Sequence, residues 1–116
     1  MPLTRKQFEL GIDKHVEEWM RRIYSYLSQH KEEAFTEDEL AKGLGVEEPS
    51  APISSNNMAR ASYIKAEQEY RDKLQLLNKA LGKLIEIGVV ETGEVRATIY
   101  YALGRRPLEL FLESKV

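Results

Sequence analysis

The sequence predicts a mostly helical α+β domain that ends in a single β-hairpin. Apolar residues recur at steps of three and four over two long stretches, which is the period of an amphipathic helix. Between them, Thr36 and Glu39 form a capping box, which marks the start of a short helix. Near the C-terminus, two runs rich in β-branched and aromatic residues flank Gly93, as in a hairpin.

The composition indicates one domain and excludes several kinds of site. The 116 residues are 42% hydrophobic and 31% charged, a length well below that at which chains divide into several cores. Without cysteine there is no disulfide or thiolate site, and the two histidines lack metal-ligand spacing, so we expect no cofactor. There is neither a membrane-length apolar run nor a signal-peptide core, so we expect a cytoplasmic protein with no membrane partner.

The two halves of the chain differ in charge. Residues 1–58 hold 7 Lys and Arg against 11 Asp and Glu, whereas residues 59–116 hold 10 against 8. The balances are −4 and +2, which sum to the formal net charge of −2. Because phosphate attracts cations, we expect any nucleic-acid contact in the second half.

The first stretch, 4–31, is predicted to be one amphipathic helix. Thr4 can cap its start, because a threonine hydroxyl accepts a hydrogen bond from an unpaired backbone N–H. Lys31 places a positive charge near the carbonyl groups of its other end. Its apolar stripe is made of Phe8, Ile12, Val16, Trp19, Met20, Ile23 and Leu27.

The second helix, 36–46, is predicted to be short. Gly45 can take the left-handed backbone that ends a helix, so that Val46 folds back onto it as a hydrophobic plug. Its first turn holds Glu37, Asp38 and Glu39, which suit the helix dipole but would repel a phosphate backbone.

A loop and a long helix follow. Residues 47–57 are rich in Pro, Ser and Asn and are predicted to be a loop. A third helix is predicted over 55–87, where tyrosines and leucines form a stripe and no proline occurs. Such a helix would measure about 50 Å, which exceeds a domain of this size. Either it breaks between Glu67 and Arg71, or its first half projects to meet a partner chain.

The hairpin is predicted over 89–103. Gly93, at the first position of a two-residue loop, favours a type II′ turn because glycine takes positive φ without strain. In that register Glu91 lies opposite Arg96. The inward face is then made of Val90, Ala97, Ile99, Tyr101 and Leu103. A last helix is predicted over 107–114, because a proline opens that segment.

The order of these elements resembles the winged helix-turn-helix DNA-binding domains of transcriptional regulators. The motifs that carry the resemblance are Leu40-Ala41-Lys42-Gly43-Leu44-Gly45-Val46, Leu84-Ile85-Glu86-Ile87-Gly88-Val89-Val90 and Tyr100-Tyr101-Ala102-Leu103. The resemblance covers roughly residues 8–103 and implies a single winged-helix domain over 1–116. It further implies that the hairpin is the wing, and that an extended or inserted third helix lies in the DNA major groove.

The side of the third helix that faces away from its leucines mixes cations with amides. Arg and Lys can contact guanine or phosphate, and Asn and Gln can pair with adenine, as a major-groove reader requires. The candidate DNA-binding residues on this helix are Arg71, Gln75, Asn78, Lys79 and Lys83. As an alternative, they are simply good helix formers on a solvated face.

Three more candidates lie in the hairpin or directly after it. Arg96 could contact phosphate, or it could pair with Glu91 across the strands. Arg105 and Arg106 follow the hairpin and either reach a backbone phosphate or remain solvated loop charges.

The sequence favours a binding function over catalysis. It holds no phosphate loop, nucleophile elbow or spaced histidine–carboxylate pair, so we expect no enzyme and see no sign of a small-molecule ligand. We expect a transcriptional regulator that binds double-stranded DNA sequence-specifically as a homodimer, because 4–31, the long helix and 108–112 offer surplus apolar surface. The alternative is a winged-helix adaptor that contacts proteins in a larger assembly without DNA, which the net acidity favours.

Overall fold

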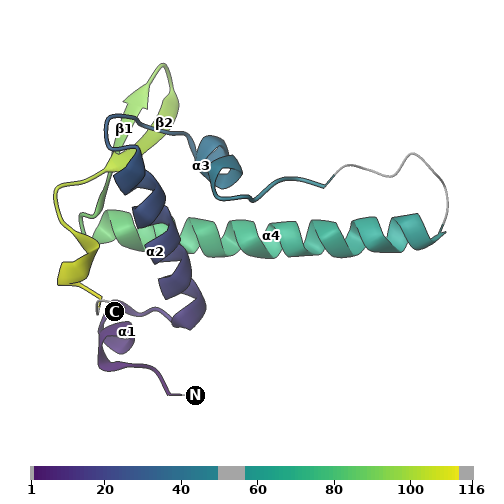
Figure 1. The fold of residues 1–116 in the computed structure, drawn as a ribbon, viewed down its shortest axis with the longest axis horizontal. Helices are drawn as coiled ribbons and strands as arrows, with labels where there is room; N and C mark the ends of the chain where they lie inside the picture. Colours follow the sequence, from purple (N-terminus) through teal and green to yellow (C-terminus); the bar gives the residue numbers. More distant parts are fainter. Residues whose placement is uncertain (1, 50–56, 113–116) are drawn as a thin grey trace.

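The computed structural model describes residues 2–49 and 57–112. Its elements are α1 (Arg5–Leu10), α2 (Lys14–Gln29), α3 (Glu37–Gly43), α4 (Asn57–Glu86), β1 (Val90–Val95), β2 (Thr98–Leu103) and the 3₁₀ turn η1 (Leu108–Leu110) (Figure 1). Within these residues the protein is α+β, with four α-helices and one two-stranded antiparallel sheet, as the sequence predicted. Most of the predicted loop 47–57 lies outside the described residues.

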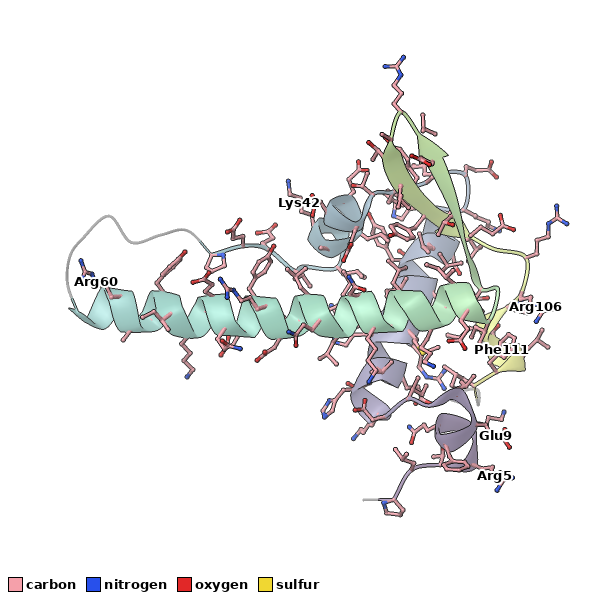
Figure 2. The ribbon with its side chains drawn as sticks, turned by 180° about the vertical axis from the view of Figure 1, so that it is seen from behind. Arg5, Glu9, Lys42, Arg60, Arg106 and Phe111 are labelled. Atoms are coloured by element: carbon pink, nitrogen blue, oxygen red, sulfur yellow. The ribbon has the colours of Figure 1, made fainter. Side chains whose placement is uncertain are left out.

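Helix α4 is continuous and dominates the shape of the molecule. The predicted 55–87 helix is therefore confirmed from Asn57 to Glu86, and a break between Glu67 and Arg71 is excluded. Its 30 residues measure about 45 Å, which approaches the longest molecular dimension of 51 Å. Its C-terminal half lies among the other elements, whereas its N-terminal half projects beyond them, with Arg60 at the far end (Figures 1 and 2).

The core lies between α2 and the C-terminal half of α4. The two helices pack against each other, and β1 and β2 close the end of this layer. Each fully buried aliphatic side chain contributes about 1.5–3 kcal/mol relative to an exposed one. The largest of these side chains are Met20, Ile23, Leu27, Leu40, Leu77, Leu84 and Leu112. The predicted leucine side of the long helix therefore faces the core.

The single helix predicted over 4–31 is wrong, because the chain breaks between α1 and α2. Gly11 ends α1 in the left-handed conformation, at φ 70° and ψ 37°. Asp13 then caps a new helix by accepting a hydrogen bond from the Val16 amide at 2.9 Å. The break turns Phe8 away from the core and leaves it 68% exposed. The Thr4 cap is confirmed, although it starts α1 rather than one long helix.

Helix α3 confirms the short capped helix predicted over 36–46. The Thr36 hydroxyl accepts from the Glu39 amide, and the Glu39 carboxylate accepts from the Thr36 amide at 3.0 Å. Gly45 takes φ 82°, and the Val46 amide donates to Ala41 at 2.7 Å. Val46 is buried, as expected for the plug of a helix end.

The hairpin forms, but its predicted register is wrong. Val90 pairs with Leu103 and Glu91 with Ala102, so the turn falls at Arg96 and Ala97 rather than at Gly93. This register pairs all six residues of each strand, whereas a turn at Gly93 would leave much of β2 without a partner. The two turns differ by an even register shift, so Val90, Tyr101 and Leu103 still share one face, but Ile99 lies near the tip and is 54% exposed. Ala97, predicted to face inward, is an exposed turn residue.

Two local features complete this end of the molecule. Phe35 pairs with Tyr101 in an isolated antiparallel bridge, with backbone hydrogen bonds of 2.8 and 2.7 Å, and so extends the sheet beside β2. The helix predicted over 107–114 is confirmed, in its described part, only as the short 3₁₀ helix η1, which is three residues long. Leu108 and Leu112 anchor this segment in the core, while residues 113 and 114 lie outside the described range.

The hairpin turn places two unfavoured residues at positive φ. Arg96 has φ 53° and Ala97 has φ 64°, and a two-residue turn with both values positive favours Asn-Gly. We expect the double variant Arg96→Asn, Ala97→Gly to raise the free energy of unfolding by about 1 kcal/mol. Urea denaturation measures this change, and an unchanged or lower midpoint would contradict it.

Candidate nucleic-acid interface

The predicted candidates on α4 occupy its solvent side. Arg71, Gln75, Asn78 and Lys79 are exposed, and Lys83 is half-buried. A helix repeats every 3.6 residues, so this side lies away from the buried leucines on the same helix. The structure therefore brings the first four together along one exposed strip, which we call the α4 strip.

Arg71 has an acidic neighbour on its own helix. Its Nη2 lies 2.8 Å from Glu67 Oε1, one turn earlier, and its side chain is 66% exposed. Gln68 likewise donates to Asp72 at 3.0 Å. Exposed pairs of this kind contribute about 0–1 kcal/mol, so a phosphate can compete with Glu67 for the guanidinium.

The Asn78 side chain makes a hydrogen bond to helix α3. Its Nδ2 donates to Oε1 of Glu37, the first residue of α3, at 3.0 Å. A hollow between α3 and α4 is lined by Glu37, Leu74, Gln75, Asn78 and Lys79. Glu37 was not among the predicted site residues, because its acidic turn suits the helix dipole and repels phosphate, and no sequence spacing relates Glu37 to Asn78.

Lys79 and Lys83 border the N-terminal end of α2. Lys83 Nζ lies 3.3 Å from Glu86 Oε2, one turn later on the same helix. The same amine lies 3.6 Å from the position that a Cβ on Gly11 would occupy. Lys83 is thus turned toward the α1–α2 junction, and it does not join the α4 strip.

Asp13, which caps α2, lies near enough to Lys79 on α4 for the two charges to interact. Its hydrogen bond from the Val16 amide lowers the pKa of Asp13 below the ordinary value of 3.8, and the charge of Lys79 acts in the same direction. A depressed pKa in the folded state means that the unfolded state binds the proton first, so stability is lost as the pH falls.

We expect this part of the loss of stability at low pH to disappear when Asp13 is replaced. Asn at this position keeps a side-chain oxygen for the Val16 amide but has no proton to bind. The difference in unfolding free energy between wild type and Asp13→Asn should therefore be constant above about pH 5. As the pH falls through 3.8 and below, wild type should lose more stability than the variant. Denaturant unfolding between pH 7 and pH 3 measures this, and parallel pH profiles would contradict the assignment.

Arg96 is the candidate whose surroundings differ most from the prediction. It lies in the exposed turn at the hairpin tip, and its expected partner Glu91 pairs with Ala102 instead. Among the described residues, Arg96 makes no ion pair or side-chain hydrogen bond. Its guanidinium is therefore available to an external anion.

Arg105 and Arg106 lie at the opposite end of the hairpin. Both are exposed, and the aliphatic part of Arg106 lies over Gly88, whose added Cβ would be 3.1 Å from Arg106 Cδ. Figure 2 shows Arg106 at the corner where α4 ends. The length of β2 separates these two residues from Arg96 by about 20 Å. The eight predicted candidates thus fall into the α4 strip, Lys83, the hairpin tip and this corner.

In the described ranges no group of three or more His, Asp or Glu side chains could hold a metal ion. None of the described helices combines the length and the apolarity of a membrane span. No family model, no curated protein and no solved structure matches the chain.

Proposed function

We propose that this chain is a cytoplasmic winged-helix protein that binds double-stranded DNA sequence-specifically and regulates transcription as a homodimer. The order α2, the Phe35 bridge, α3, α4 and the hairpin supports this proposal. The observation that carries it is the α4 strip of exposed cations and amides, on the same chain as a hairpin tip whose Arg96 has no acidic partner among the described residues. Such a set suits base edges and phosphates together.

The link between the two helices is longer than in an ordinary helix-turn-helix. A turn of about 3–4 residues is usual, whereas α3 ends at Gly43 and α4 begins at Asn57. Helix α3 contacts α4 at Asn78, far from the start of α4. We therefore treat the C-terminal half of α4 as the reading part and its projecting half as an extension inserted before it.

Exposed apolar side chains support the homodimer. Phe8 is 68% exposed, Ile64 on the projecting half of α4 is 65% exposed, and Leu110 in η1 is 67% exposed. A dimer interface would remove such side chains from water. Light scattering at tens of micromolar should give twice the chain mass of 13.4 kDa. If the dimer reads DNA, its two reading helices should lie about 34 Å apart or a multiple of that distance. A monomer mass would refute the dimer.

A salt titration tests the DNA proposal. Wild-type protein is titrated against labelled mixed-sequence duplexes at several salt concentrations, and bound DNA is selected from a random pool. A DNA reader should lose affinity steeply as salt rises and should enrich one sequence. No binding at low salt would refute the proposal.

A second candidate is the protein adaptor, and one observation favours it. The first turn of α3 holds three acidic side chains, and one of them, Glu37, contacts the α4 strip directly. Acidic groups at this place oppose a phosphate backbone. If the titration finds no DNA binding, the adaptor becomes the leading interpretation.

A further inference from the structure

We propose that Glu37 is a specificity-determining positioning residue, which fixes the orientation of the Asn78 amide for base reading and keeps phosphate away from it. This inference rests on the proposed DNA-binding function and extends it to a residue outside the predicted set. It starts from the contact between the first residue of α3 and the middle of the exposed face of α4.

The geometry makes the contact directional. Glu37 Oε1 accepts from Asn78 Nδ2 at 3.0 Å, and the two residues are 41 positions apart in the chain. A carboxylate only accepts hydrogen bonds, so Asn78 must turn its NH₂ group, and not its carbonyl oxygen, toward α3. The amide is then held in one of its two flipped orientations, which a free surface asparagine exchanges.

The groups that remain on Asn78 match one base. One N–H of Nδ2 and both lone pairs of Oδ1 are left. When Glu37 accepts from the N–H that points away from Oδ1, the free N–H and Oδ1 offer a donor and an acceptor side by side. Adenine presents the N7 acceptor and the N6 donor in the major groove, the pair that an Asn side chain recognises bidentately. Holding the amide in advance lowers the entropy lost when it meets the base.

The charge of Glu37 acts against non-specific contact. The two hydrogen bonds of the capping box at the start of α3 join Thr36 and Glu39, so the Glu37 carboxylate has no part in capping the helix. Its negative charge is close to the α4 strip, well within the screening length of about 10 Å at 0.1 M salt. Repulsion of the DNA backbone there lowers affinity for every sequence, whereas the positioned amide favours one, so Glu37 trades affinity for selectivity.

The test is random-pool selection of bound DNA with wild type, Asn78→Ala and Glu37→Ala. The position whose base preference is lost in Asn78→Ala identifies the base that Asn78 reads. Glu37→Ala should weaken the preference at that same position by about tenfold. Its affinity for mixed-sequence DNA at low salt should rise severalfold, because a repulsive charge is gone. The double variant, with both Asn78→Ala and Glu37→Ala, should show no greater loss of base preference than Asn78→Ala alone.

Two variants separate positioning from charge. Asp38→Ala removes a neighbouring exposed charge of α3 that does not bond Asn78, and should raise mixed-sequence affinity while the base preference stays. Glu37→Gln keeps an accepting oxygen, and should retain most of the preference while affinity rises. Circular dichroism checks that each variant is folded.

The outcomes distinguish the two proposals. If wild type binds no DNA, the proposed function fails, and this inference fails with it. If wild type selects a sequence but Glu37→Ala keeps the preference that Asn78→Ala loses, the positioning role is refuted while DNA binding stands. If Asn78→Ala loses no preference, the role of Glu37 is refuted in the same way.

Discussion

Replacing Gly104 by alanine is expected to lower the free energy of unfolding by about 3 kcal/mol. A Cβ at this position would lie 2.6 Å from the carbonyl oxygen of Gly88 and 2.9 Å from that of Val89. Both obstacles are backbone atoms, so no side chain can rotate away to make room. The Gly104 amide also donates to Val89 at 2.7 Å, which ties the end of β2 to the entry of β1. Denaturant unfolding measures the loss.

Gly93→Ala is the matched control. Gly93 lies in β1 and pairs with Tyr100, and a Cβ there would meet nothing within 4 Å. Its stability should therefore change by no more than about 0.5 kcal/mol. Equal losses in the two variants would show that glycine is needed in this hairpin for its flexibility and not for the close approach at Gly104.

The elements with local signals were predictable. The capping box at Thr36 and Glu39 and the plug at Val46 act within a few residues, so α3 was found with nearly its own ends. The break at Gly11 also had local signals, a glycine and a capping aspartate, yet the apolar stripe continued across it. Periodicity alone does not reveal that a helix is restarted in a new direction.

The hairpin register depended on contacts that are distant in sequence. Its turn uses Arg96 and Ala97, which carry no turn signal, while the glycine that suggested a turn lies within β1. The observed register lets Tyr101 pair with Phe35, a residue from before α3, and keeps Val90 buried. Tertiary pairing thus outweighed the local preference.

The sequence was enough to predict which side of α4 is exposed, but not which residues of other elements lie beside it. The period of the buried leucines was enough to place Gln75 and Lys79 on the solvent side of α4. The Glu37–Asn78 hydrogen bond joins two helices across a long connection, and no helical period relates such residues.

The second large effect is expected on DNA affinity, when the two cations of the α4 strip are removed. If Arg71 and Lys79 each neutralise one phosphate, the variant with both replaced by alanine should reduce the slope of log affinity against log salt by about 1.8. At 0.1 M salt this corresponds to an affinity loss of about 60-fold. The fold should persist, because both side chains are exposed and Arg71 makes only a surface pair with Glu67. A salt series with one duplex measures slope and affinity together.

A control of equal charge decides whether the loss is local. Lys31 and Lys42 are exposed cations outside the α4 strip, and Figure 2 shows Lys42 on α3 pointing away from α4. Replacing this pair by alanine changes the net charge by the same amount, so a long-range field would weaken binding equally in the two variants. Direct contact predicts that the control keeps the wild-type slope. Equal slopes in all three proteins would show that DNA, if bound, meets another face of the molecule, because released counterions report only the phosphates actually contacted.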